Sequence, residues 1–126
     1  MSSYLVRIKE LVNTIRYSNN GYKEDDIEVV ERAVDSIFNY YYISYRNKIH
    51  TPIVYAKYEG NELVNLLTDI NKSEINAHKS AVDGCKMINR LCRLYDVDLI
   101  CTESTDNDEI NKFVGEFVLD VYNSEI

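Results

Sequence analysis

Apolar residues in the first fifty positions recur every three or four residues, as they do in amphipathic helices. The first such stretch contains Leu5, Ile8, Leu11, Val12 and Ile15. The run "NNG" at 19–21 ends this predicted helix, because glycine tolerates the left-handed conformation of a C-cap. A second helix is predicted from about residue 25 to about residue 49, and its first turn is acidic, as the helix dipole favours.

The remaining sequence predicts a corner, one long helix and one short helix. Thr51 followed by Pro52 matches an N-cap with a first-turn proline, so we expect a new helix to begin there. Between about 62 and 95 the apolar spacing predicts a single helix of roughly 30 residues, about 45–50 Å long. Glu74 is the only break, and "NKSE" at 71–74 resembles a capping box, so two shorter helices are an alternative. A last helix follows the cap "TDNDE".

These elements predict an all-α fold, a four- or five-helix bundle with the helix at about 62–95 as its centre. We expect a single helical domain over 1–126 and no more than a short extended piece near 97–101. A chain of 126 residues with 45% hydrophobic residues can form a core without disulfides.

The composition also bears on localisation. No apolar run approaches the roughly 20 residues that cross a bilayer. The N-terminus lacks the charge and apolar order of a signal peptide. Three cysteines are an odd number without framework spacing, which favours reduced thiols. We therefore expect a cytoplasmic protein that does not associate with a membrane.

The formal charge of −7 argues against direct nucleic-acid binding, which needs clustered cations. The acidic residues of 103–126 indicate either a solvated face or a surface that docks on a basic partner. Cations recur every seven residues on the long helix, which indicates a solvated face, an anion site, or a contact for the acidic end, within the chain or across a dimer. They are Lys72, Lys79, Lys86 and Arg93.

Metal, cofactor and catalytic signatures are missing from the sequence. His78, Cys85 and Cys92 are seven residues apart, about 10.5 Å along a helix, which is too far for one metal ion. We expect no metal and no cofactor, and we expect His78 to be half-buried with a hydrogen-bond partner. Arg46 and His50 approach the spacing of helical ribonucleases of the HEPN type, which gives an enzymatic alternative.

Four tyrosines lie between residues 40 and 45, more than one helix face can bury. Tyr41 continues the core stripe, Tyr42 and Tyr45 form a second stripe, and Tyr40 is left on the far side. Tyrosine combines a large ring with a polar tip, so the surplus favours an interface. With Arg46 and neighbouring cations, the second stripe could also hold a small anionic, nucleotide-like ligand.

Two segments near the C-terminus resemble a family of small bacterial helical proteins known only as a domain of unknown function. They are "YEGNELVNLLTDINKSEINAHKSAVDGCKMINRLCRLYDVDLI" and "EINKFVGEFVLDVYN", and the resemblance covers roughly 58–122. It implies a continuous long helix and points to His78, Asn89 and Arg90 as its polar positions. It implies no activity. Proteins of this kind often travel on phages and plasmids, an association that keeps an inhibitor role in view.

We therefore expect a non-enzymatic binding protein, an inhibitor or sequestering module for a basic protein or a small anionic ligand. We also expect a homodimer, because small residues at Ala77, Ala81 and Gly84 would let a second helix approach closely. The alternatives are the ribonuclease and a purely structural, antitoxin-like dimer. The candidate binding residues are Tyr42, Tyr45, Arg46, His50, His78, Asn89 and Arg90.

Overall fold

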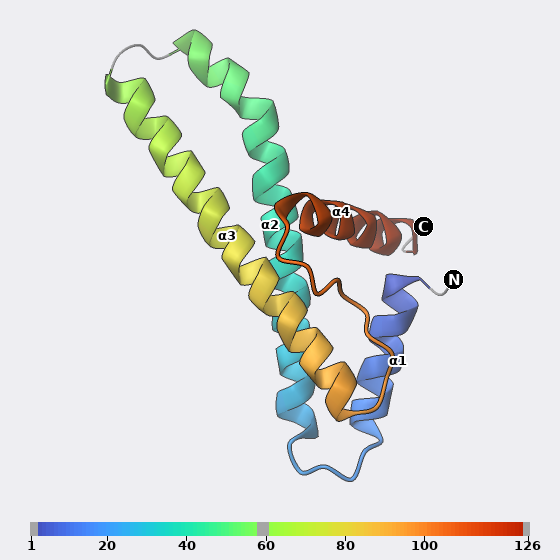
Figure 1. Ribbon diagram of the computed structural model, residues 1–126. Coiled ribbons are helices and arrows are strands. Elements are labelled where there is room, and N and C mark those ends of the chain that lie inside the picture. The colour runs from blue at the N-terminus through green and yellow to red at the C-terminus, as the bar shows by residue number, and fades with distance from the viewer. Residues whose placement is uncertain (1–2, 58–60, 125–126) are drawn as a thin grey trace.

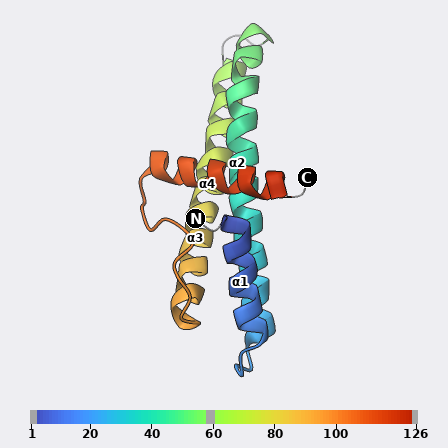
Figure 2. The same ribbon diagram turned by 90° about the vertical axis from the view of Figure 1, so that its right-hand side faces the viewer.

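The protein consists of four helices in the computed structural model, which describes the backbone of residues 3–57 and 61–124 and the side chains of residues 3–48 and 69–123. The helices are α1 (Tyr4–Arg16), α2 (Lys23–Lys57), α3 (Asn61–Leu94) and α4 (Asn107–Ser124). The described backbone contains no strand, so the all-α prediction and the long helix at about 62–95 are confirmed. As Figures 1 and 2 show, α2 and α3 form a long antiparallel hairpin, α1 lies along α2, and α4 crosses the hairpin.

Side-chain caps define two of the helix starts. The Ser3 hydroxyl accepts a hydrogen bond from the Val6 N–H at 3.2 Å and begins α1. The Asp106 carboxylate accepts from the N–H groups of Asp108 and Glu109, at 2.8 and 3.2 Å, and begins α4. Capping by Asp106 therefore fixes where α4 begins and hence the position of Asn107 and Asn111 in its first turns.

Two helix breaks considered from the sequence are absent. Helix α2 continues through Thr51 and Pro52 to Lys57, so the predicted corner is wrong. A proline removes one backbone donor and strains the preceding turn, which bends a helix without having to end it. Helix α3 is continuous through 71–74, since Glu74 does not cap a helix start. Its carboxylate instead accepts from the Asn47 amide of α2 at 3.3 Å.

The small residues of α3 serve the contact between α3 and α2. Ala77, Ala81 and Gly84 are buried, and a Cβ atom on Gly84 would lie 3.0 Å from the Ala33 carbonyl oxygen and 3.2 Å from the Ala33 Cα atom. Helix α2 therefore occupies the notch that the sequence analysis assigned to a second copy. The homodimer stays a prediction, without this feature as its support.

The tyrosine-rich part of α2 is oriented differently from the prediction. Tyr40 is only 4% exposed and extends the buried stripe of Ala33 and Ile37, so its assignment to the far side is wrong. The predicted core stripe of α2 is wrong at Tyr40 because α2 packs against α1, α3 and α4 together, so more than one face of the helix is covered. Tyr42 and Tyr45 are 61% and 55% exposed, so their rings remain open to solvent.

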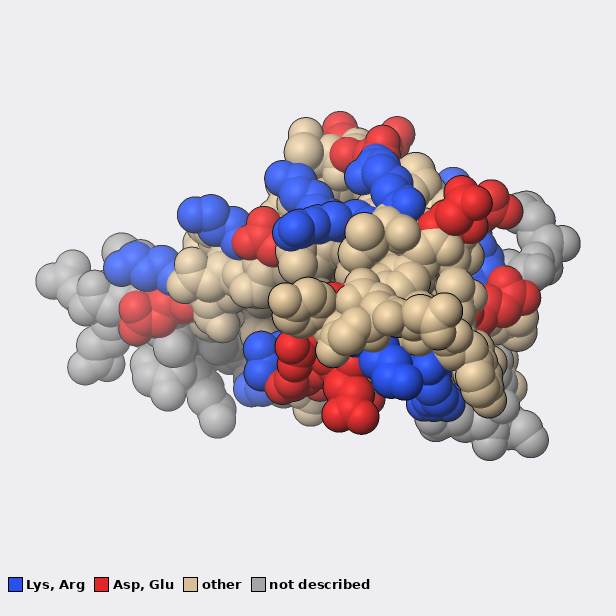
Figure 3. Space-filling model, turned by 90° about the horizontal axis from the view of Figure 1, so that it is seen from below, with Lys and Arg blue, Asp and Glu red and all other residues tan. Residues whose placement is uncertain are grey.

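Several acidic residues of the C-terminal part contact the same chain. The Leu5 N–H donates to the Asp120 carboxylate at 2.9 Å, and the Tyr4 hydroxyl donates to Glu116 at 3.3 Å. Arg93, from the cationic row of α3, forms an ion pair with Glu103. The view from below in Figure 3 shows cations and acids interspersed around an uncharged area. The acidic end is thus used in part to close the fold.

Across the described residues, none of the helices is long and apolar enough to cross a bilayer.

Candidate functional site

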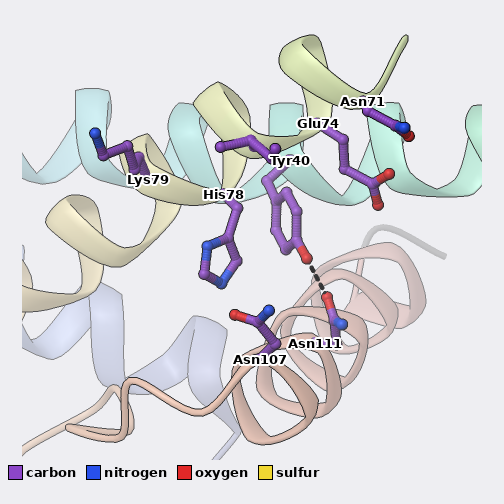
Figure 4. Close-up of a pocket in the computed structure, with 8 residues that line it drawn as sticks. Tyr40, Asn71, Glu74, His78, Lys79, Asn107 and Asn111 are labelled. Carbon is purple, nitrogen blue, oxygen red and sulfur yellow. Dashed lines mark hydrogen bonds between the residues drawn. The ribbon is translucent and has the colours of Figure 1, made fainter. Parts of the chain in front are cut away.

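A cavity of about 500 Å³ lies between α2, α3 and the first turns of α4 (Figure 4). Cavities of about 300–1,000 Å³ are typical of small-molecule sites. Its walls carry more polar than apolar side chains. They are Tyr40, Asn71, Glu74, Ile75, His78, Lys79, Asn107 and Asn111.

His78 places a buried nitrogen in this cavity. Its Nε2 atom is shielded from solvent and has no hydrogen-bond partner, so the partner that we predicted for His78 is missing at this nitrogen. The imidazole packs edge-on against the Tyr40 ring, with centroids 5.2 Å apart and planes at 69°. Figure 4 shows the ring pointing toward α4. An unsatisfied buried polar atom costs about 1–3 kcal/mol, so a group that bonds Nε2 would bind favourably.

Tyr40 and Asn111 join α2 to α4 at the edge of the cavity. The Tyr40 hydroxyl donates to the Asn111 side-chain oxygen (Figure 4). Burial and the negative charge of Glu74 both raise the pKa of Tyr40, and the Asn111 bond partly opposes them. The hydroxyl is thus a neutral donor at physiological pH, and the oxygen can still accept a further bond.

Helical spacing brings the polar groups together. Asn107 and Asn111 are four residues apart on α4, so they lie on one face, and Asp106 sets that face by capping the helix. On α3, Glu74 and His78 are also four residues apart. The cavity therefore combines amides, an imidazole, a phenol and a carboxylate, which can bind a polar molecule at several points. None of the described residues that line it is a serine, threonine or cysteine nucleophile.

Asn89 and Arg90, which the sequence analysis placed among the binding residues, lie outside the cavity. The Asn89 side chain is 2% exposed and bonds both backbone groups of Cys101, donating to the carbonyl at 3.0 Å and accepting from the N–H at 3.1 Å. It therefore anchors the loop that leads to α4, which is a structural role. Arg90, its neighbour, is exposed.

The predicted tyrosine–arginine site is an open surface of α2. The Arg46 guanidinium lies over the Tyr42 ring, 5.7 Å from its centroid, and Tyr45 stacks on Tyr41 with centroids 6.3 Å apart. The depression beside Arg46 also contains Asp69, which opposes an anion. The His50 side chain lies outside the described residues. The ribonuclease alternative therefore stays a prediction, although α2 is continuous through both positions.

The three cysteines are free and buried. Burial raises the pKa of the Cys92 thiol, and a hydrogen bond with Cys85 together with burial raises that of Cys101. In the part of the chain that the structure describes, no three side chains of histidine, cysteine, aspartate or glutamate are placed to hold a metal ion. These thiols are thus part of the core.

Of the six predicted binding residues whose side chains the structure describes, only His78 lines the cavity. The apolar pattern does not single out Tyr40, Glu74, Asn107 or Asn111 as site residues, and it marks Glu74 only as a break in the seam and as part of a possible capping box. A usable signal was present, because Glu74 with His78 and Asn107 with Asn111 are polar pairs at four-residue spacing on two predicted helices.

Comparison with known proteins agrees with the resemblance seen in the sequence and extends it. No curated protein and no solved structure is detectably similar to this chain. The model of one family, described as "Protein of unknown function (DUF3232)", matches residues 4–125. This range includes all of α1 and α2 as well as the C-terminal part. The chain therefore belongs to the DUF3232 family.

Proposed function

We propose that this protein is a non-enzymatic, cytoplasmic binding protein that sequesters or is regulated by a small polar group held in the cavity between α2, α3 and α4. The observation that carries this proposal is the buried, unpartnered Nε2 atom of His78 in a cavity of about 500 Å³. A ligand that bonds this atom offsets the desolvation of the imidazole, and the neighbouring amides supply further bonds.

Binding is favoured over catalysis by what surrounds His78. A general base acts on a nucleophile within hydrogen-bond reach, and a third group usually orients the base. The described residues that line the cavity include no serine, threonine or cysteine nucleophile, and Nε2 has no partner. Three free, buried cysteines fit the reducing cytoplasm.

The first experiment is to purify the protein from cells, denature it, and identify any released small molecule by mass spectrometry. NMR then locates the binding. The chain has two histidines, His50 and His78, so each imidazole gives a separate signal, and His78→Gln assigns them. We expect a ligand to shift the His78 signal and to leave the His50 signal in place. A ligand that shifts only His50 would refute the cavity and favour the site on α2.

A second variant separates binding from folding. Asn107 is exposed at the first turn of α4, so Asn107→Ala should leave the helical circular dichroism spectrum and the thermal midpoint nearly unchanged. It should weaken the binding of the identified ligand, because it removes one amide from the cavity wall. Undiminished binding in this variant and in His78→Gln would exclude the cavity as the site.

A further inference from the structure

The side chains around the cavity create a negative potential. Glu74 is half-buried in the wall, and its charge reaches the Tyr40 hydroxyl, whose pKa is raised by burial and by this carboxylate. Lys79 is the one cation among the described residues that line the cavity. It is exposed, and in Figure 4 it points away from Tyr40, Asn107 and Asn111. Glu74 is thus the one carboxylate among the described residues that line the cavity, and Lys48 lines an adjoining depression that shares Tyr40 and Asn111 with it.

The rim adds to this potential. Asp106 and Asp108 flank Asn107 in the sequence, and both are exposed at the start of α4. The start of α4 thus has three carboxylates, Asp106, Asp108 and Glu109, against the one cation Lys112, which lines a different depression together with Arg7 and Glu109. A cation that approaches the cavity is thus attracted, and an anion is repelled.

The hydrogen-bonding groups in the cavity also suit a donor. Nε2 of a neutral imidazole can accept when the proton is on Nδ1, and the carboxylate of Glu74 accepts only. The oxygens of Asn107 and Tyr40 can each accept as well, and the Tyr40 ring can contact a cation through its face. Guanidinium and ammonium groups have several N–H donors and no acceptor, so they match this set.

We propose, building on the binding function above, that the cavity holds a guanidinium or primary ammonium group. Such a group comes either as a free amine or as an arginine or lysine side chain of a basic protein. Glu74 supplies the charge, and His78 and the asparagine oxygens of α4 orient the donors. The overall formal charge of −7 assists the approach of either source.

Two matched small molecules test the charge. Methylguanidinium and methylurea have nearly the same shape, and only the first is a cation. Titrated into the full chain by NMR, methylguanidinium and agmatine should shift the His78 signal at millimolar concentrations, and methylurea should do so at least about tenfold more weakly, since charge-assisted bonds are the stronger ones. Inorganic phosphate and adenosine monophosphate should leave the signal unchanged.

Two matched variants test the residue. Glu74→Gln keeps the shape of the side chain and removes its charge, and it should weaken agmatine binding about tenfold or more. Asp83→Asn removes the same charge from an exposed position nine residues further along α3, about 13.5 Å away. It should change the binding less than twofold. Equal effects of the two variants would overturn the role of Glu74.

The two sources are separated by an arginine-containing peptide. Binding at least about a hundredfold tighter than that of agmatine indicates a basic protein, and equal affinities indicate a free amine. If phosphate or the nucleotide shifts His78 and the cations do not, the ligand class is wrong while the cavity remains a binding site. If no probe of either charge shifts His78 and nothing is released on denaturation, both this inference and the proposed function fail.

Discussion

Two glycines in the middle of helices, Gly84 in α3 and Gly115 in α4, give a matched test of the α2–α3 contact. Replacing either one with alanine lowers the conformational entropy of the unfolded chain and favours the helix by about 1 kcal/mol. This gain is the same in both variants, so it cancels in their difference. The difference in the free energy of unfolding therefore reports the steric cost alone.

The surroundings of the two glycines predict opposite results. At Gly84 the new Cβ would lie 3.0 Å from the Ala33 carbonyl oxygen and 3.2 Å from its Cα atom. Both are backbone atoms, which cannot rotate away, so α2 and α3 must separate at a cost of about 1–3 kcal/mol. At Gly115 the nearest atom is Cε2 of Tyr41 at 3.9 Å, an ordinary contact. We expect Gly84→Ala to be neutral or destabilising by up to about 2 kcal/mol, and Gly115→Ala to be stabilising by up to about 1 kcal/mol.

Urea denaturation followed by circular dichroism measures both values. The slope m should be the same in the two variants, so that a shift in the midpoint reports stability. We expect a difference of about 1–3 kcal/mol between them. Two variants that agree within about 0.5 kcal/mol, which is the size of an ordinary surface effect, would refute the close approach of α2 and α3 at Ala33.

Three further predictions concern the loop anchor, the thiols and Tyr40. Asn89→Ala should lower the free energy of unfolding by about 2–4 kcal/mol, because it leaves two backbone groups of Cys101 unsatisfied. Arg90 is exposed, so Arg90→Ala should change the free energy of unfolding by less than about 0.5 kcal/mol. Similar urea midpoints for the two variants would contradict this prediction. A thiol reagent should label the native protein slowly and all three cysteines quickly after denaturation, since the thiols are buried and burial keeps Cys92 protonated. The pKa of Tyr40 is raised in the folded state, so its contribution to the free energy of unfolding is fully present below pH 10.0 and is lost as the pH rises from there through the folded pKa. The stability of Tyr40→Phe should therefore fall less steeply above pH 10.0 than that of the unchanged protein. Parallel curves of stability against pH would contradict this assignment.

Much of the fold follows from local patterns in the sequence. The apolar spacing between 62 and 95 needs only the period of a helix to be recognised, and α3 spans Asn61–Leu94. Tyr40 was harder to place because the orientation of α2 depends on three packing partners, which a single apolar stripe does not represent. At Pro52 a local pattern gave the wrong answer. Thr51 and Pro52 match a helix start, yet both lie within the continuous helix α2.

The cavity could be predicted only in part, because its members come from three helices. His78 stood out as a rare histidine on a long helix, and it does line the cavity. Its partners across the cavity depend on where α4 crosses the hairpin, and no periodicity within one helix specifies that crossing. Asn89 was predicted as a binding residue, but its buried bonds to Cys101 give it a structural role. The position of a polar residue on a helix does not distinguish these two roles.

Helix α4 is tied to the rest of the fold along its length. Near its C-terminal end, Asp120 accepts from the backbone of α1. In the middle of α4, Phe113 and Phe117 pack on the Tyr4 ring, with centroids 5.0 and 5.8 Å apart. Near its N-terminal end, the bond between Tyr40 and Asn111 joins it to α2 beside the cavity. The first turn of α4 also contributes Ile110, which is 1% exposed, to the core. The wall that α4 gives the cavity is therefore held by core packing, and a change in the shape of the cavity at this wall would disturb the packing of Ile110.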